Sequence, residues 1–294
     1  MNEPAPTTVE PAAAEPTAPG PRRGVAAGVP YLALPPSGEP TAATPVVLAW
    51  HLMDAPRTPE AFAAALPLAG VDAWRVHLEL PMTGSRLPAG GPEELMARAQ
   101  SDAVLELYGP IAQQAVAEAP AVLAQVRADL GCPDGPLALV GGSMGAAVAF
   151  LVLLEAGLGA AAAVLVSPLL QLRPLVESFA LRYGTEYAWS PAADAVAGRL
   201  DAVARVAGFT AAGRPPVLLV VGEDDDEEAF RRPAAALHEA LGAEYGDPGR
   251  VRLEVVPGMG HALAAEPGLE AAPQTPHAAR VDAAATDWLR AHLR

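Results

Sequence analysis

The feature that most constrains this 294-residue chain is a repeated alternation of short apolar runs with longer stretches of helical spacing. The stretches with helical spacing include residues 92–130, 144–156, 227–241 and 275–293. Short apolar runs bounded by Gly or Pro are typical of strands buried on both faces. These runs occupy residues 28–34, 45–50, 73–80, 137–140, 162–166, 217–221 and 251–256. The alternation predicts an α/β fold, a doubly wound and mostly parallel sheet with helices on both faces.

The longest helical stretch, residues 92–130, contains Pro110 and Pro120. A proline inside a helix removes a backbone hydrogen bond, and its ring clashes with the preceding turn. We therefore expect these prolines to divide the stretch into two or three helices.

The start of the chain differs from the rest in composition. Residues 1–20 are acidic and rich in Pro, Ala and Thr, with no basic segment followed by a hydrophobic one. This pattern predicts a disordered tail rather than a secretory signal, so a cytoplasmic location is expected. The predicted organisation is a tail at residues 1–24 and one α/β domain at residues 25–294.

The connection between the apolar runs at 162–166 and 217–221 is longer than a simple crossover requires. It is also rich in aromatic residues, namely Phe179, Tyr183, Tyr187, Trp189 and Phe209. Two interpretations stay open for residues 168–215: a small helical cap inserted over one end of the sheet, or an elaborated crossover with ordinary packing aromatics.

The composition excludes several chemistries. All 19 basic residues are arginine, there is one cysteine, and the formal net charge is −15. Without lysine the chain has no phosphate-binding P-loop lysine, no Schiff base and no Ser-Lys dyad. The strong negative charge disfavours nucleic acid as a partner. No apolar run reaches the roughly 18–20 residues of a membrane span. We expect a small-molecule substrate, no metal and no cofactor.

A candidate nucleophile lies in the sequence Leu137–Ala147, LALVGGSMGAA. Gly141 to Gly145 match the pattern G-x-S-x-G, between a predicted strand and a predicted helix, which is the context of a nucleophile elbow. The turn would expose the Oγ atom of Ser143, and a side chain at Gly141 or Gly145 would collide with its neighbours. The following helix would point the N–H of Met144 at a developing oxyanion.

A serine needs a base, and the base needs an acid to orient it. The apolar run 217–221 is followed by the acidic cluster Glu223-Asp224-Asp225-Asp226. The run 251–256 is followed by Pro257-Gly258-Met259-Gly260-His261. All three candidates therefore follow strand ends, where open α/β sheets bind ligands. The chain order is Ser143, an acid from residues 224–226, then His261.

These motifs resemble those of the α/β-hydrolase fold family of serine hydrolases, over roughly residues 28–293. The resemblance rests on GGSMG at 141–145, VLLVVGEDD at 217–225 and VVPGMGHA at 255–262. In that family the acid comes two or three residues after the glycine that ends its strand. The resemblance therefore implies Asp225, with Asp224 and Asp226 as alternatives.

The sequence departs from the family at the first oxyanion donor. The family commonly has a His-Gly pair there, whereas this chain has His51-Leu52-Met53. The resemblance implies Met53 as the second backbone donor, beside Met144. We expect the Leu52 side chain to narrow the pocket, and His51 to bond loop backbone beneath the site. Leu52, His51 and Met82 are candidate substrate contacts, and Glu79 and Arg86 follow or end the same strand as Met82.

The resemblance implies a serine hydrolase with Ser143 as nucleophile, His261 as base and Asp225 as acid. Its default reaction is carboxylic-ester hydrolysis, with thioester, lactone or small peptide bonds as variants. Two alternatives stay open: an acyltransferase that uses the same triad, and a non-catalytic binding protein on this fold.

Overall fold

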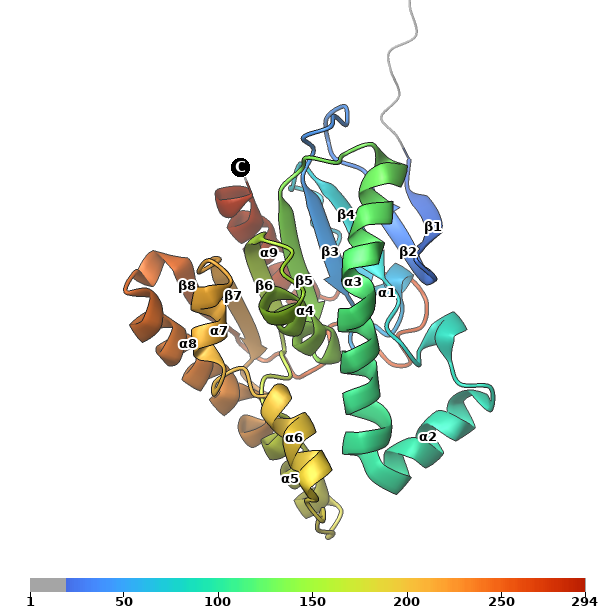
Figure 1. Cartoon of the computed structure of the whole chain (residues 1–294), viewed down its shortest axis with the longest axis vertical. Coiled ribbons are helices and arrows are strands. Elements are labelled where there is room, and N and C mark those ends of the chain that lie inside the picture. The colour runs from blue at the N-terminus through green and yellow to red at the C-terminus, as the bar shows by residue number, and fades with distance from the viewer. Residues whose placement is uncertain (1–19, 294) are drawn as a thin grey trace, which may run out of the picture.

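The computed structural model describes residues 20–293 and is built on an eight-stranded sheet (Figure 1). The strand order is β1-β2-β4-β3-β5-β6-β7-β8. Strands β3 to β8 run parallel to one another, whereas β2 is antiparallel to β4 and β1 to β2. Their bounds are β1 (Arg22–Ala26), β2 (Val29–Leu34), β3 (Val46–Trp50), β4 (Trp74–Leu78), β5 (Leu137–Gly142), β6 (Ala160–Val166), β7 (Val217–Gly222) and β8 (Val251–Val256).

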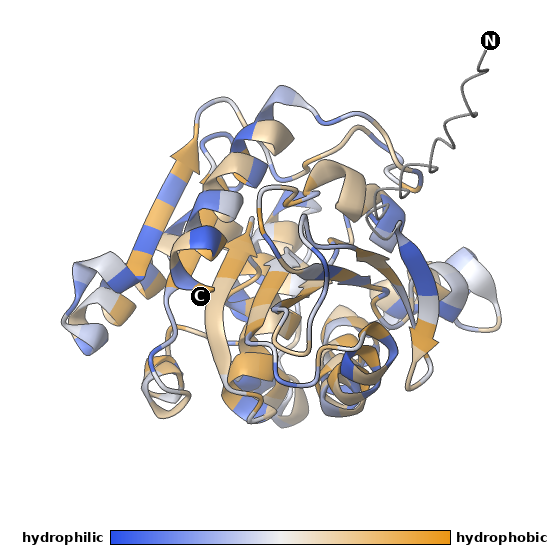
Figure 2. Ribbon diagram, turned by 90° about the horizontal axis from the view of Figure 1, so that it is seen from above, coloured by the Kyte–Doolittle hydropathy of each residue, from blue (hydrophilic) through white to orange (hydrophobic). Residues whose placement is uncertain are grey.

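Helices cover both faces of this sheet. One buried cluster joins the sheet to α3 (Gly109–Leu130), α4 (Met144–Glu155) and α8 (Arg232–Tyr245). A second buried cluster joins the opposite face to α1 (Pro59–Ala65) and α9 (Pro276–His292). The central strands are hydrophobic along their length, whereas the edge strand β8, at the left in Figure 2, alternates hydrophobic and hydrophilic residues. The predicted fold class, a mostly parallel sheet with helices on both faces, is confirmed.

A further group of elements lies past the carboxyl ends of the parallel strands, at the lower end of the molecule in Figure 1. It includes α2 (Gly91–Asp102), α5 (Leu172–Arg182) and α6 (Pro191–Arg199). The shorter elements are η1 (Gly84–Arg86), η2 (Ala103–Tyr108), α7 (Val206–Ala211), η3 (Glu227–Arg231) and η4 (Pro248–Arg250), of which η2 and η3 are π-helical. Within residues 20–293, no helix combines the length and the apolar composition that crossing a bilayer requires.

The sheet begins earlier than the sequence suggests. Strand β1 starts at Arg22, inside the range 1–24 that is predicted as a tail; residues 1–19 of that tail lie outside the described residues. The turn at Ala27 and Gly28, both at positive φ (49° and 83°), joins β1 to β2. An edge strand tolerates charged side chains, so the polar start RRG joins the sheet without burying its arginines.

Helix α3 runs without a break through Pro120. Pro110 lies in the first turn of α3, where a proline is tolerated, so the predicted boundary there is correct. The predicted break at Pro120 is wrong. The flanking residues Val116, Ala119, Val122 and Leu123 are all buried in the core. Burial of this face stabilises the helix by more than the roughly 3 kcal/mol that an internal proline costs.

Candidate active site

Ser143 lies in the sharp turn between β5 and α4, with φ of 49° and ψ of −114°. A positive φ is strained for a residue with a side chain, and such strain concentrates at functional sites. A Cβ at Gly141 would lie 2.2 Å from the Gly145 carbonyl oxygen, and one at Gly145 would lie 2.2 Å from the Trp50 carbonyl oxygen. The predicted collisions are confirmed, since only glycine fits at either position.

His261, in the loop after β8, connects Ser143 to a buried carboxylate. Its Nε2 is 2.9 Å from Ser143 Oγ, and its Nδ1 is 2.9 Å from Asp225 Oδ2. A carboxylate oxygen only accepts, so Nδ1–H donates to Asp225 and a neutral ring leaves Nε2 to accept the serine proton. The three side chains that the sequence singles out therefore lie in one hydrogen-bonded chain.

Of the three neighbouring aspartates, Asp225 contacts His261. Its side chain is 2% exposed, and its other oxygen accepts the N–H of Asp226 at 2.8 Å. Asp226 has a different task, because it caps η3 by accepting from the N–H groups of Glu228 and Ala229. Asp224 is exposed. The backbone of the acidic loop is held against the histidine loop, since the N–H of Asp224 donates to the Met259 carbonyl at 2.9 Å.

The aromatic ring of Phe230 stacks on the imidazole of His261. Their centroids are 4.0 Å apart and the ring planes are inclined at 33°. Phe230 lies in η3, five residues after Asp225, and is 5% exposed. Nothing in the sequence singles out Phe230 for this contact, since a single phenylalanine in a helical segment carries no signal beyond packing.

His51 is fully buried and fixes the loop that follows β3. Its Nδ1 lies 2.6 Å from the Leu52 carbonyl oxygen, and its Nε2 lies 3.2 Å from the Leu80 N–H. The carbonyl requires Nδ1 to donate and the N–H requires Nε2 to accept, so the ring is neutral. Burial, opposed in part by the bond to Leu52, lowers the pKa of His51 to about 4. His51 thus holds loop backbone, as expected, and does not line a pocket.

Leu52 is also fully buried. Its side chain turns into the core, where Leu52 Cδ1 would lie 2.2 Å from a Cβ placed on Gly142. The expectation that Leu52 narrows the pocket is therefore wrong, because this side chain packs under the loop instead of above it.

Residues 97–265 match the sequence model of a family described as having the alpha/beta hydrolase fold. The chain belongs to the α/β-hydrolase fold family. No curated protein matches this sequence significantly.

Solved structures share this α/β-hydrolase fold. The Thermus thermophilus protein TT1662 is 23% identical and has a TM-score of 0.67, over 93% of this chain and 98% of that one. A dienelactone hydrolase from Anabaena variabilis is 18% identical, with a TM-score of 0.52 over 93% and 99% of the two chains. A thermophilic esterase from Thermogutta terrifontis is 16% identical, with a TM-score of 0.55 over 93% of each chain. At these identities the likeness establishes the shared fold.

An apolar pocket includes Met53, the residue after Leu52, whereas Ser143, Asp225 and His261 are not among the residues that line it. Its volume is about 510 Å³. Met82 also lines it, as the sequence suggests, and an ion pair of 2.6 Å between Arg57 and Glu266 lies at its edge. The apolar wall comes mainly from α2 and the residues before it: Leu87, Pro92, Leu95, Met96 and Ala99.

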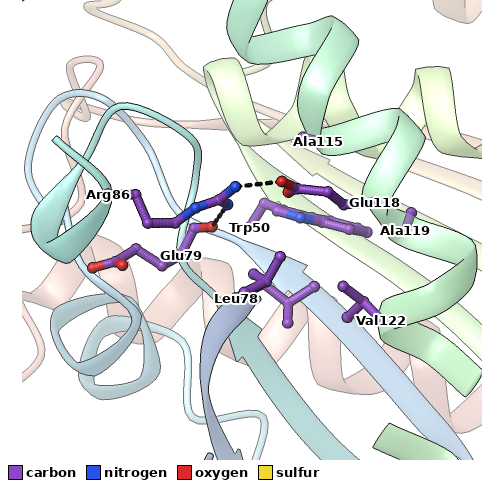
Figure 3. A pocket seen from close by; sticks show the side chains of 9 residues that line it. Trp50, Leu78, Glu79, Arg86, Ala115, Glu118, Ala119 and Val122 are labelled. Carbon is purple, nitrogen blue, oxygen red and sulfur yellow. Dashed lines mark hydrogen bonds and ion pairs between the residues drawn. The ribbon is translucent and has the colours of Figure 1, made fainter. Parts of the chain in front are cut away.

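Glu79 and Arg86 do not line this pocket but anchor the segment that does. Figure 3 shows the Arg86 guanidinium donating to the Glu79 carbonyl oxygen at 2.9 Å and to the Glu118 carboxylate of α3 at 2.6 Å. The Glu79 carboxylate accepts from the N–H and the hydroxyl of Ser85. The cavity lined by Glu79, Arg86 and Glu118 has a volume of about 10 Å³, which leaves room for about one water molecule.

In the part of the chain that the structure describes, no three His, Cys, Asp or Glu side chains are grouped as metal ligands would be. The groups gathered past the ends of β5, β7 and β8 are instead Ser143, Asp225 and His261, joined by hydrogen bonds.

Proposed function

We propose that this protein is a serine hydrolase that cleaves carboxylic esters through a covalent acyl-enzyme. The observation that carries the proposal is the hydrogen-bond chain from Asp225 through His261 to Ser143, with 2.9 Å at each link. A serine hydroxyl is a weak nucleophile unless a positioned base removes its proton, and this chain supplies that base and its orienting acid.

In the first step, Ser143 Oγ attacks the ester carbonyl carbon while its proton moves to His261 Nε2. The buried Asp225 carboxylate stabilises the imidazolium that forms. The tetrahedral intermediate then expels the alcohol, which takes the proton from Nε2 and leaves an acyl group on Ser143. Water repeats the sequence with the same base, which releases the carboxylic acid and restores the serine.

Two backbone donors are available to the oxyanion. The Met144 N–H lies at the first residue of α4, where the helix dipole favours negative charge. The Leu52–Met53 peptide is trans, so its N–H points opposite to its carbonyl. Because the Leu52 carbonyl faces His51, the Met53 N–H faces the other way and supplies the second donor.

The pocket beside Met53 supports substrates with an apolar acyl or alcohol part. Its volume of about 510 Å³ is within the usual range of small-molecule sites. Residues 168–215 form a cap past the strand ends in this proposal, fastened to the last residue of α2 by a hydrogen bond of 2.6 Å from the Tyr187 hydroxyl to Asp102. Thioesters, lactones and small peptide bonds are further substrates of the same chemistry.

Labelling with a fluorophosphonate probe tests the proposal. We expect the wild type to be labelled, and Ser143→Ala to lose labelling and hydrolysis of p-nitrophenyl esters. Ser167→Ala is the matched control, because Ser167 is a buried serine whose hydroxyl has no hydrogen-bond partner within residues 20–293. A folded wild-type protein that is neither labelled nor active on any ester of a graded acyl series would contradict the proposal.

A further inference from the structure

A second carboxylate lies beside the catalytic end of His261. Asp54 Oδ2 is 3.6 Å from His261 Nε2, the nitrogen that faces Ser143. Asp225 already occupies the opposite nitrogen, Nδ1, so Asp54 has no place as the acid of the triad. Its side chain is 52% exposed, which leaves the carboxylate open to a ligand in the site.

The charge of Asp54 is not neutralised by the protein. Among residues 20–293, its carboxylate accepts no hydrogen bond, and no arginine lies within ion-pair distance of it. The nearby Arg57 is committed to Glu266 at 2.6 Å. A carboxylate that stands unpaired next to the reacting atoms attracts a cation into the site.

The loop holds Asp54 firmly in this position. Its neighbours Leu52 and Ala55 are both fully buried, so the loop is packed on each side of the aspartate. The Ala55 carbonyl also accepts the N–H of Leu263, two residues after the histidine, at 3.0 Å. The backbone at Asp54 is therefore pre-organised, and a ligand would not have to order the loop on binding.

A tyrosine lies close enough to Asp54 to be affected by its charge. Tyr108, at the end of η2, is partly buried, and burial together with the Asp54 charge raises the pKa of its phenol to about 12. Its ring thus remains neutral at physiological pH. A neutral phenol ring near a carboxylate is a favourable environment for an ammonium group, through cation–π attraction in addition to charge.

The position of Asp54 also indicates which half of an ester it meets. The leaving alcohol must approach His261 Nε2 within about 3 Å to take its proton. Asp54 lies 3.6 Å from the same nitrogen, so it flanks the departing alcohol rather than the acyl group that stays on Ser143.

We propose that Asp54 is a specificity residue that selects esters whose leaving alcohol carries a positive charge, such as amino-alcohol esters. This inference rests on the proposed ester hydrolysis. The formal net charge of −15 acts in the same direction, because it attracts cations to the whole molecule.

A matched pair of substrates tests the inference: a choline ester and the 3,3-dimethylbutyl ester, its neutral carbon isostere, with the same acyl chain. Proton release at constant pH gives kcat/KM for each. We expect the wild type to favour the choline ester by about tenfold, the size of a partly exposed charge pair with a cation–π contact. In Asp54→Asn the ratio should fall to within about twofold of unity.

Glu39→Gln is the control for net charge. It removes one charge from an exposed residue between β2 and β3, at the sheet edge away from the site, and should keep the tenfold ratio. Raising the salt to 1 M should reduce the wild-type ratio, because the screening length falls to about 3 Å.

Three results would overturn the inference. A wild type that hydrolyses both esters equally, or favours the neutral one, leaves the hydrolase proposal intact and removes the charge selection. An Asp54→Asn variant with both rates lowered by the same factor shows that Asp54 acts through His261 and not on the substrate. Failure to hydrolyse either ester, together with failure of fluorophosphonate labelling, removes the proposed function as well.

Discussion

The side chain of Leu52 fills the space that a side chain on Gly142 would need, with only 2.2 Å between Leu52 Cδ1 and a Cβ on Gly142. The two residues lie on neighbouring parallel segments, after β3 and at the end of β5. A large residue thus faces a glycine, and this complementary packing holds the loop after β3 against the strand that leads to Ser143.

This packing predicts coupling between the two positions. Gly142→Ala should destabilise the protein by about 1–3 kcal/mol through overpacking, and Leu52→Ala by about 2–5 kcal/mol through a cavity. The double variant should lose less than the sum, since the new methyl group enters the space that leucine leaves. Urea unfolding of the four proteins measures the coupling, and strictly additive losses would argue against the contact.

The acid of the proposed triad can be tested with a matched pair of variants. Asp225→Asn should lower kcat by about 10³–10⁴-fold, because an amide cannot hold His261 in the required tautomer. Asp224→Asn changes the adjacent exposed carboxylate and should leave kcat within about twofold. Steady-state kinetics on one p-nitrophenyl ester compares them, and equal losses in both variants would refute the assignment.

Phe230 is predicted to position His261 by stacking on its ring. Phe230→Leu keeps an apolar side chain but removes the flat surface, so the imidazole gains rotational freedom. We expect kcat to fall about tenfold with little change in KM, the signature of a misplaced base. Phe230→Tyr keeps the ring and should retain most of the activity. Unfolding curves measured alongside exclude loss of the fold, and an unchanged kcat in Phe230→Leu would remove the positioning role.

His77 predicts a pH dependence of stability. Burial, with smaller contributions from Arg75 and His51, lowers its pKa from 6.5 to about 3. Between these values the unfolded chain binds a proton that the folded chain does not. Stability is therefore complete above about pH 6.5 and falls as the pH drops, by up to about 1.4 kcal/mol per pH unit for this histidine. His51 adds a similar slope down to about pH 4.

His77→Leu separates the two histidines. Both ring nitrogens of His77 are buried without a hydrogen-bond partner in residues 20–293, so leucine should stabilise the protein by about 1 kcal/mol at pH 7. The difference in stability between the variant and the wild type should be larger at pH 5, because His77 no longer contributes to the loss of stability as the pH falls. Urea unfolding at both pH values measures this, and a variant with the wild-type slope would show that His77 does not titrate on unfolding.

The sequence was sufficient to predict the sheet and to single out Ser143 and His261 as candidate site residues, because each of these features has a local cause. Strands β3, β5, β6 and β7 are continuous apolar runs, and Ser143 lies in a glycine-containing turn directly after β5. His261 lies in a glycine-containing turn after β8, in which Arg252 and Glu254 interrupt the apolar residues. The local sequence does not choose among the three aspartates of the acidic cluster. Only the spacing typical of the family favours Asp225.

Features that depend on distant packing could not be predicted in the same way. Pro120 stays helical because its neighbours are buried against other elements, which composition does not reveal. Asp54 reaches His261 only because the loops after β3 and β8 meet past the same edge of the sheet. Neither residue belongs to a motif, so their roles emerge only when segments far apart in the chain are brought together.

The segment that lines the pocket is fastened to α3 by Arg86, whereas Ser143, Asp225 and His261 follow β5, β7 and β8. The residues that line the pocket and the residues of the hydrogen-bonded chain are thus held in place by different elements. If the proposed ester hydrolysis holds, exchange of residues 87–99 should admit substrates of another shape while the hydrogen bonds between Asp225, His261 and Ser143 stay in place. This division makes the scaffold a suitable starting point for directed evolution of the proposed activity.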